Sequence, residues 1–344
     1  MKVARTVLVA SLLPFLLQFE TVSTQVVVPR TVYLMGTRAT LTVRVPDRDV
    51  AIQQLERMVR SLEETEAELS TWRSDTDLGA LNHQTVGEGL VISPPLCRLW
   101  PELTFWHRET QGAFDPAVGS LVEAWGLRGT GRLPSPSELL AALSHSGWEN
   151  LSFDGARCRV VRNVGVTVDA GAFGKGVGLR RLQREFGEFG SWLVDFGGQV
   201  AVSEASSADP WPVAIADPRH RDLAVHGVRL AEGSLATSGG SERSQFVGGR
   251  AVGHILDPRN GRPVDWAGSV TVWHQDPFVA DALSTALYVM GPEMGPCYAE
   301  IRDLAALFLE PLSVTEDSKL STRATTGFRS QFPTVGEVVV PNCP

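Results

Sequence analysis

The sequence predicts an α+β fold, a single layered domain with a mixed, largely antiparallel sheet and flanking helices. Helical patterns dominate the first half of the chain and strands dominate the second, and the two do not alternate as regular βαβ units. The chain has 344 residues, 43% of them hydrophobic, which is enough to bury a sizeable core. No repeat or long linker divides it, so residues 25–344 are expected to form one domain.

Amphipathic patterns locate the elements of the first half. Residues 38–45 alternate between apolar and polar side chains, as in a half-buried strand. Residues 49–70 and 94–111 carry apolar side chains at helical spacing, which predicts two helices. The segment Ser-Pro-Ser-Glu at 135–138 has the order of an N-cap, a first-turn proline and a capping-box acid, so a third helix should begin there.

The second half is expected to consist mostly of strands and turns. A short strand at 165–168 leads through a glycine-rich turn at 169–178 into a helix. Another helix, at 277–290, should end at Gly291-Pro292. The remaining strands are expected at 191–202, 211–217, 225–238, 252–256 and 269–274.

The N-terminus and the cysteines bear on where the chain resides. Residues 1–24 have two basic residues followed by an apolar run at 7–17, which is typical of an export signal and too short for a membrane span. The sequence therefore predicts an exported protein on the periplasmic or cell-envelope side, with no stable span beyond this signal. No Cys-x-x-Cys pair occurs among Cys97, Cys158, Cys297 and Cys343. Free thiols are the favoured interpretation, although export would permit disulfides.

Charge and motif content exclude several classes of protein. Lys and Arg total 31 against 39 Asp and Glu, a formal net charge of -8, and no basic run suggests a nucleic-acid partner. The metalloprotease motif H-E-x-x-H and the hydrolase motif G-x-S-x-G are absent. Gly174-Lys175 resembles part of a P-loop, but Gly176 stands where that motif needs Ser or Thr. Asp169 likewise stands where its first Gly belongs.

An aspartate and a threonine on the helix at 277–290 form a candidate metal site. Asp281 and Thr285 are four residues apart and so share one face of the helix. A carboxylate beside a hydroxyl offers only oxygen ligands, which suits Mg²⁺. The same pair is also explained by an acid near a helix N-terminus and a threonine bonded to its own helix.

Two polar turns carry further candidates. Small residues from Asp169 to Gly176 let the backbone approach a ligand, and Lys175 with the amides at the helix start offers positive charge to a pyrophosphate. His254 can serve as a general base, because an ordinary histidine titrates near neutral pH. Taken singly, each feature also fits a tight turn, a surface lysine or a structural histidine.

Together these segments resemble the ApbE family, the FAD:protein FMN transferases. The matching segments follow the family's order along nearly the whole chain after residue 24. They are LMGT at 34–37, LSTWR at 69–73, LN at 81–82, GAFDP at 112–116, VDAGAFGKG at 168–176, FGG at 196–198, ATSG at 236–239, HILDP at 254–258 with Gly261, and ADALSTAL at 280–287.

The resemblance implies an Mg²⁺-dependent enzyme that binds FAD, releases AMP and joins FMN through a phosphoester to a Thr or Ser hydroxyl. The implied acceptor is a flavoprotein subunit of a redox complex. By position, Asp281 and Thr285 match side-chain metal ligands, and Ala172 matches a backbone-carbonyl ligand. Flavin- or nucleotide-contacting positions are matched by Met35, Trp72, Ala113, Phe114, Asp115, Asp169, Lys175, Ser238 and His254. The catalytic candidates are Lys175, Asp281 and His254, with His254 as the base.

Two other functions are compatible with the same residues. An FAD pyrophosphatase would use water as the nucleophile and give FMN and AMP. A non-catalytic FAD-binding protein of the cell envelope would need no metal pair. The joint presence of Asp281, Thr285, Lys175 and His254 favours an enzyme.

Overall fold

The structure is a computed structural model. It describes residues 25–71, 73–240, 245–247, 250–313 and 319–335, together with 339 and 343. The predicted export signal at 1–24 and the predicted flavin contact Trp72 lie outside these residues. Within the described ranges, no helix combines the length and the apolar character needed to cross a membrane.

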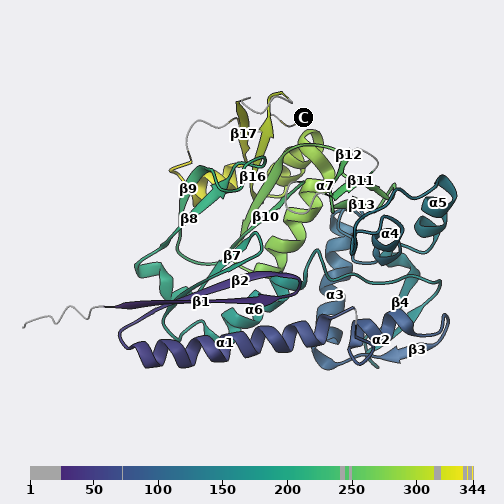
Figure 1. Cartoon of the computed structure of the whole chain (residues 1–344), viewed down its shortest axis with the longest axis horizontal. Helices are drawn as coiled ribbons and strands as arrows, with labels where there is room; N and C mark the ends of the chain where they lie inside the picture. Colours follow the sequence, from purple (N-terminus) through teal and green to yellow (C-terminus); the bar gives the residue numbers. More distant parts are fainter. Residues whose placement is uncertain are drawn as a thin grey trace, which may run out of the picture.

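An eight-stranded sheet runs through the centre of the molecule (Figure 1). Neighbouring strands are antiparallel throughout, so the α+β class is confirmed and the main sheet is wholly antiparallel. In spatial order the strands are β1 (Val26–Leu34), β2 (Thr37–Val45), β6 (Ser191–Phe196), β7 (Gln199–Val202), β10 (Ser234–Gly239), β15 (Ser269–His274), β16 (Ala305–Pro311) and β17 (Leu320–Ala324).

Different elements cover the two faces of this sheet. Side chains alternate across a strand, and along β16 Phe308 joins the core beneath α7 while Leu307 joins a second core that includes Phe328 of α8. One face carries α1 (Arg48–Leu69), α6 (Gly174–Phe186) and α7 (Pro277–Ile301). The other carries α8 (Thr326–Gln331) and the hairpin of β8 (Trp211–Ala216) and β9 (Ala224–Leu230).

A mostly helical region lies at one end of the sheet, on the right in Figure 1. It contains α2 (Asp77–His83), α3 (Pro94–Glu109), α4 (Gly119–Ala124), α5 (Pro136–Ser144), the turn η1 (Trp148–Asn150), and a small sheet of β3 (Gly89–Val91), β5 (Arg159–Arg162) and β4 (Leu151–Asp154). The remaining short elements are η2 (Glu204–Ala208), β11 (Gln245–Val247), β12 (Arg250–Val252), β13 (Leu256–Asp257) and β14 (Arg262–Pro263).

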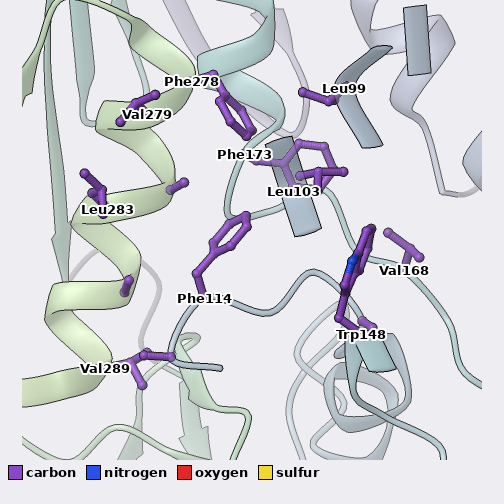
Figure 2. Close-up of a cluster of buried hydrophobic side chains, with 14 of the residues drawn as sticks. Leu99, Leu103, Phe114, Trp148, Val168, Phe173, Phe278, Val279, Leu283 and Val289 are labelled. Atoms are coloured by element: carbon purple, nitrogen blue, oxygen red, sulfur yellow. The ribbon is translucent and has the colours of Figure 1, made fainter. Parts of the chain in front are cut away.

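The largest hydrophobic core joins this helical region to α7. Figure 2 shows Phe114, Phe173 and Phe278 directed into the same space beside α7, and all three are fully buried. Phe114 comes from the GAFDP segment and Phe173 from the glycine-rich turn. Packing of these rings therefore holds two of the predicted site segments against the helix that carries Asp281.

The prediction of free thiols is wrong, because the structure pairs all four cysteines. Cys97 of α3 is bonded to Cys158, and Cys297 of α7 is bonded to Cys343. The sequence showed only that no two cysteines are close along the chain. Their proximity arises from tertiary folding, since the two bridges span 61 and 46 residues.

Most predicted elements exist, and the errors lie where tight turns interrupt a hydrophobic run. Residues 191–202 form two strands because Gly197 and Gly198 make a hairpin turn at positive φ. Residues 225–238 are likewise divided near Gly233. The predicted strand at 252–256 is a loop between two short strands, and β1, β16 and β17 were not anticipated. The helix from Pro277 does not stop at 290 but kinks at Gly291 and continues.

The predicted strand at 165–168 is an extended segment without strand partners, because side chains satisfy its backbone. Asn82 accepts from the amide of Val168 at 2.7 Å and donates to its carbonyl at 2.9 Å. The buried guanidinium of Arg162 donates to the carbonyl of Val166 at 2.6 Å and to the carbonyls of Asn82 and Gln84. These bonds replace a sheet ladder and fix the approach to Asp169.

Candidate functional site

Asp281 stands where the start of α6 meets α7. Its side chain is 4% exposed. One oxygen accepts from the ammonium of Lys175 at 3.0 Å, and the other accepts from the backbone amide of Gly176 at 2.8 Å. The glycine-rich turn and the helix at 277–290, which are about a hundred residues apart, therefore form one site, which we call the Asp281 corner (Asp281, Lys175, Gly176, Thr285 and Ala172).

Gly176 is required by the close approach of these two helices. A Cβ at this position would lie 2.6 Å from the carbonyl oxygen of Pro277 and 2.8 Å from the Cβ of Asp281. The neighbouring atoms belong mainly to the backbone of α7, which cannot move aside as a flexible side chain would. This contact explains why glycine occupies the place where a P-loop has Ser or Thr.

The amide of Gly176 bonds to a side chain because it belongs to the first turn of α6. Ala172 lies before Phe173, the N-cap of α6, so the amide of Gly176 in the first turn has no partner within the helix. Here it donates to Asp281, whereas the next amide, that of Val177, makes the ordinary bond to Phe173 at 3.0 Å. Asp281 thus satisfies an amide at the start of α6, and the carbonyl of Ala172 lies outside the bonding of that helix.

Thr285 lies one turn after Asp281 and faces strand β10. Its hydroxyl is 3.3 Å from the carbonyl of Asp281 and 3.4 Å from the hydroxyl of Ser238. Ser238 is also 2.9 Å from the hydroxyl of Ser284. The structure therefore brings together the predicted residues Asp281, Thr285 and Ser238.

Asp169 opens the glycine-rich turn and anchors it to the GAFDP segment. Its amide donates to the carbonyl of Pro116 at 2.7 Å, and one carboxylate oxygen accepts from the amide of Gly171 at 2.7 Å. The other oxygen is paired with the guanidinium of Arg128. Sequence reasoning missed Arg128, since a lone arginine in a polar loop carries no distinguishing pattern.

The predicted flavin contacts at 113–115 point their side chains away from open space. Ala113 and Phe114 are buried in the core of Figure 2. The carboxylate of Asp115 is also buried and accepts from the amides of Ala117 at 2.7 Å and Trp148 at 3.1 Å. These side chains shape the segment, and its amides at Ala113 and Phe114 are bonded to Thr110, so the structure shows no open ligand contact at these positions.

A histidine lies beside Asp115. His107 Nδ1 is 3.4 Å from the carboxylate of Asp115, and His107 Nε2 is 3.9 Å from that of Glu149. Burial raises the pKa of Asp115 to about 6, and the neighbouring His107 acts in the opposite direction. We call this group the Asp115 corner (Asp115, His107 and Glu149).

Met35 and His254 lie on two other turns, and of the two it is Met35 that lies beside the start of α6. Met35 occupies the β1–β2 turn at positive φ, and its amide donates to Glu66 at 2.8 Å. Its sulfur is 3.9 Å from the place a Cβ on Gly174 would occupy, so it lies beside the start of α6. His254 is half-buried in the loop between β12 and β13, next to Gly253, which in turn lies near Gly240 at the end of β10.

A cavity of about 720 Å³ adjoins the Asp169 turn, and its size is typical of small-molecule sites. It lies between α2, α4 and the loop from α4 to α5. Its lining is polar and rich in glycine: Thr71, Asn82, His83, Gly119, Val122, Glu123, Gly126, Arg128, Gly129, Thr130, Gly131, Arg132 and Thr167.

The fold is that of solved flavin transferases. The crystal structure of the flavinyl transferase ApbE from Pseudomonas stutzeri, apo form, superposes with a TM-score of 0.77 at 29% identity, covering 92% of this chain and 98% of that one. The FAD:protein FMN transferase of Vibrio cholerae is 30% identical over 257 residues, 73% of this chain and 77% of that protein. The protein of the same name from Haemophilus influenzae is 26% identical over 281 residues, 78% and 80% of the two chains. The sequence pattern of the ApbE family matches residues 35–308, and this chain belongs to that family.

Proposed function

We propose that this chain transfers FMN from FAD to a Thr or Ser hydroxyl of an acceptor flavoprotein and releases AMP. The Asp281 corner carries this proposal. There the carboxylate of Asp281, the hydroxyl of Thr285 and the carbonyl of Ala172 occur on segments that meet at Gly176. The relatives named as FAD:protein FMN transferases support the same activity.

The residues present fit an Mg²⁺ ion. All three candidate donors are oxygen atoms, which is the ligand type that Mg²⁺ prefers. The position of Ala172 before the N-cap of α6 supports this assignment, because its carbonyl takes no part in the bonding of that helix and Asp281 is buried. When bound there, the ion would supply positive charge to the pyrophosphate of FAD.

The protein's own residues account for the remaining requirements of the reaction. The acceptor hydroxyl must lose its proton as its oxygen bonds to the phosphorus of FMN, while the bond to AMP breaks. His254 is the proposed base for that proton. Lys175, at the start of α6, would donate to phosphate oxygens together with the amides there.

Mass spectrometry tests this function directly. Chain lacking residues 1–24 is incubated with FAD, Mg²⁺ and an acceptor protein bearing a Ser- or Thr-containing flavinylation segment. We expect the acceptor mass to increase by that of FMN, and the increase to be lost with EDTA and in Asp281→Ala. His254→Gln tests the proposed base. Its matched control is His226→Gln, which changes a histidine of β9 outside the site.

Other outcomes would identify the alternatives. Free FMN and AMP with unmodified acceptor, repeated across several redox-complex flavoprotein subunits, would indicate an FAD pyrophosphatase. Intact FAD that remains bound would indicate a flavin-binding protein. Either result would overturn the proposed transfer.

We further propose that the chain is exported and acts on the periplasmic or cell-envelope side. The signal-like N-terminus and the two disulfides support this location, because disulfides persist in oxidising compartments. Fractionation of cells that produce the full chain should place it outside the cytoplasm. Recovery in the cytoplasm with four alkylatable thiols would contradict export.

A further inference from the structure

Arg128 connects two segments of the site that are far apart in sequence. Its guanidinium donates to the hydroxyl of Thr71 at 3.0 Å and is paired with the carboxylate of Asp169. The side chain of Arg128 is 33% exposed and that of Asp169 is 19% exposed. The pair therefore lies at a solvent-accessible edge, where a ligand can reach it.

The loop that carries Arg128 is held in place by bonds that do not involve Arg128. The indole of Trp125 donates to the carbonyl of Gly261 at 2.7 Å. The amide of Arg132 donates to the carbonyl of Trp125 at 2.9 Å. The loop is thus closed on itself and anchored to the hairpin that follows His254. Arg128 extends from a fixed base towards Asp169.

Arg128 stands between the 720 Å³ cavity and the turn that leads to Lys175. Arg128 and Thr71 line the cavity, and Asp169 begins the turn. A dinucleotide that reaches from this cavity to the Asp281 corner would pass the guanidinium. We propose that Arg128 binds a phosphate group of FAD and so sets the enzyme's affinity for this substrate.

Charge supports this assignment. The two carboxylates that flank the glycine-rich turn, Asp169 and Asp281, would repel a pyrophosphate if they were alone. Each has a cation beside it, since Lys175 contacts Asp281 and Arg128 contacts Asp169. A guanidinium suits the second position because its planar donors match phosphate oxygens.

Binding measurements separate phosphate contact from a purely structural role. Dissociation constants for FAD, ADP and riboflavin are measured with wild type, Arg128→Ala, Arg128→Lys and Arg128→Gln, in the presence of Mg²⁺. We expect Arg128→Ala to weaken FAD and ADP by about 10- to 100-fold, the loss of one charge-assisted hydrogen bond, while riboflavin, which lacks phosphate, changes less than about twofold. Arg128→Lys should keep part of the affinity.

The matched control is Arg157→Ala, which removes an exposed arginine paired with Asp154 in the turn between β4 and β5, outside the cavity lining. It should leave all three constants unchanged. If Arg128→Ala weakened the binding of riboflavin and of FAD equally, the arginine would have only the structural role of holding Asp169 and the loop. An unchanged constant for FAD would exclude the contact.

The proposal rests on FAD being the substrate, and the experiment keeps the two failures apart. Binding is measured without an acceptor, so wild type that binds FAD but modifies no acceptor would refute the transferase and leave the role of Arg128 testable. Wild type that modifies the acceptor, with Arg128→Ala unchanged in both FAD affinity and KM, would refute only the role of Arg128. Arg128→Gln provides the neutral variant if Arg128→Ala does not fold.

Discussion

Asp281 and Asp115 are both buried aspartates that join distant segments, but their partners differ. Asp281 receives a lysine ammonium and one backbone amide. Asp115 receives two backbone amides, and its nearest cationic group is a histidine at 3.4 Å that is charged only when protonated.

This difference separates a site built for ligand exchange from one built for shape. At the Asp281 corner the ammonium is a flexible partner, and under the proposed function it would donate to a phosphate while Asp281 would hold the metal ion. At the Asp115 corner, backbone amides hold the carboxylate, so it determines the path of the chain at the GAFDP segment. Substitutions at the two corners should therefore affect different measurements.

The largest effect is expected at Asp281. Asp281→Asn keeps the shape of the side chain but removes its charge, so transfer of FMN should slow by about 10²- to 10³-fold. The initial rate of acceptor mass increase measures this. Asp115→Asn is the matched buried aspartate and should slow transfer far less. Comparable losses in the two variants would erase the proposed distinction between the corners.

The disulfide of the Asp115 region should contribute the next largest effect, and on stability. Cys97 lies on α3, the helix that also carries His107. Replacing Cys97 and Cys158 together by Ser should lower the free energy of unfolding by about 2–4 kcal/mol, because the bridge closes a long loop. Urea unfolding measures the loss. Identical midpoints for the double variant and wild type would show that the bridge does not stabilise the fold.

Gly176→Ala should destabilise the Asp281 corner. The added methyl overlaps the backbone of α7, which we expect to cost about 1–3 kcal/mol despite the higher helix propensity of alanine. Gly227→Ala is the control, since a Cβ there meets no atom within 4 Å. Urea unfolding compares the two variants. Equal free energies of unfolding would show that α6 and α7 accommodate the added methyl without loss of stability.

Asp115 should give the smallest effect, one that depends on pH. Its folded pKa of about 6 is raised above the unfolded value, so it favours folding at low pH, and this contribution is lost as pH rises from about 4 through about 6. Relative to Asp115→Asn, wild type should lose about 1–3 kcal/mol of unfolding free energy across that window.

Two other ionisable groups face Asp115, the imidazole of His107 and the carboxylate of Glu149, and both affect its pKa. Unfolding curves at several pH values for wild type, Asp115→Asn and His107→Gln separate the contributions. Parallel pH profiles for wild type and Asp115→Asn would contradict the raised pKa.

Predictions from the sequence were most reliable where one local rule decides the outcome. The helix at 135–144 begins with the expected capping box, formed by Ser135 and Glu138. Helical spacing also placed Thr285 one turn after Asp281, and its hydroxyl bonds to the carbonyl of Asp281, as expected for a threonine bonded to its own helix. The prediction of a strand at 165–168 was wrong, because Asn82 and Arg162 bond to the backbone groups that a neighbouring strand would use. Such long-range side-chain partners leave no periodic signal in the sequence.

By itself the sequence determined the element types, the family, and the residue types available for chemistry, because amphipathic periods, caps and ordered motifs are local in the chain. Only the tertiary structure decided that Gly176 must lack a Cβ, that Arg128 reaches Asp169, and that all four cysteines are paired. These outcomes depend on the distance between segments 41 to about 105 residues apart, which packing of the shared core sets.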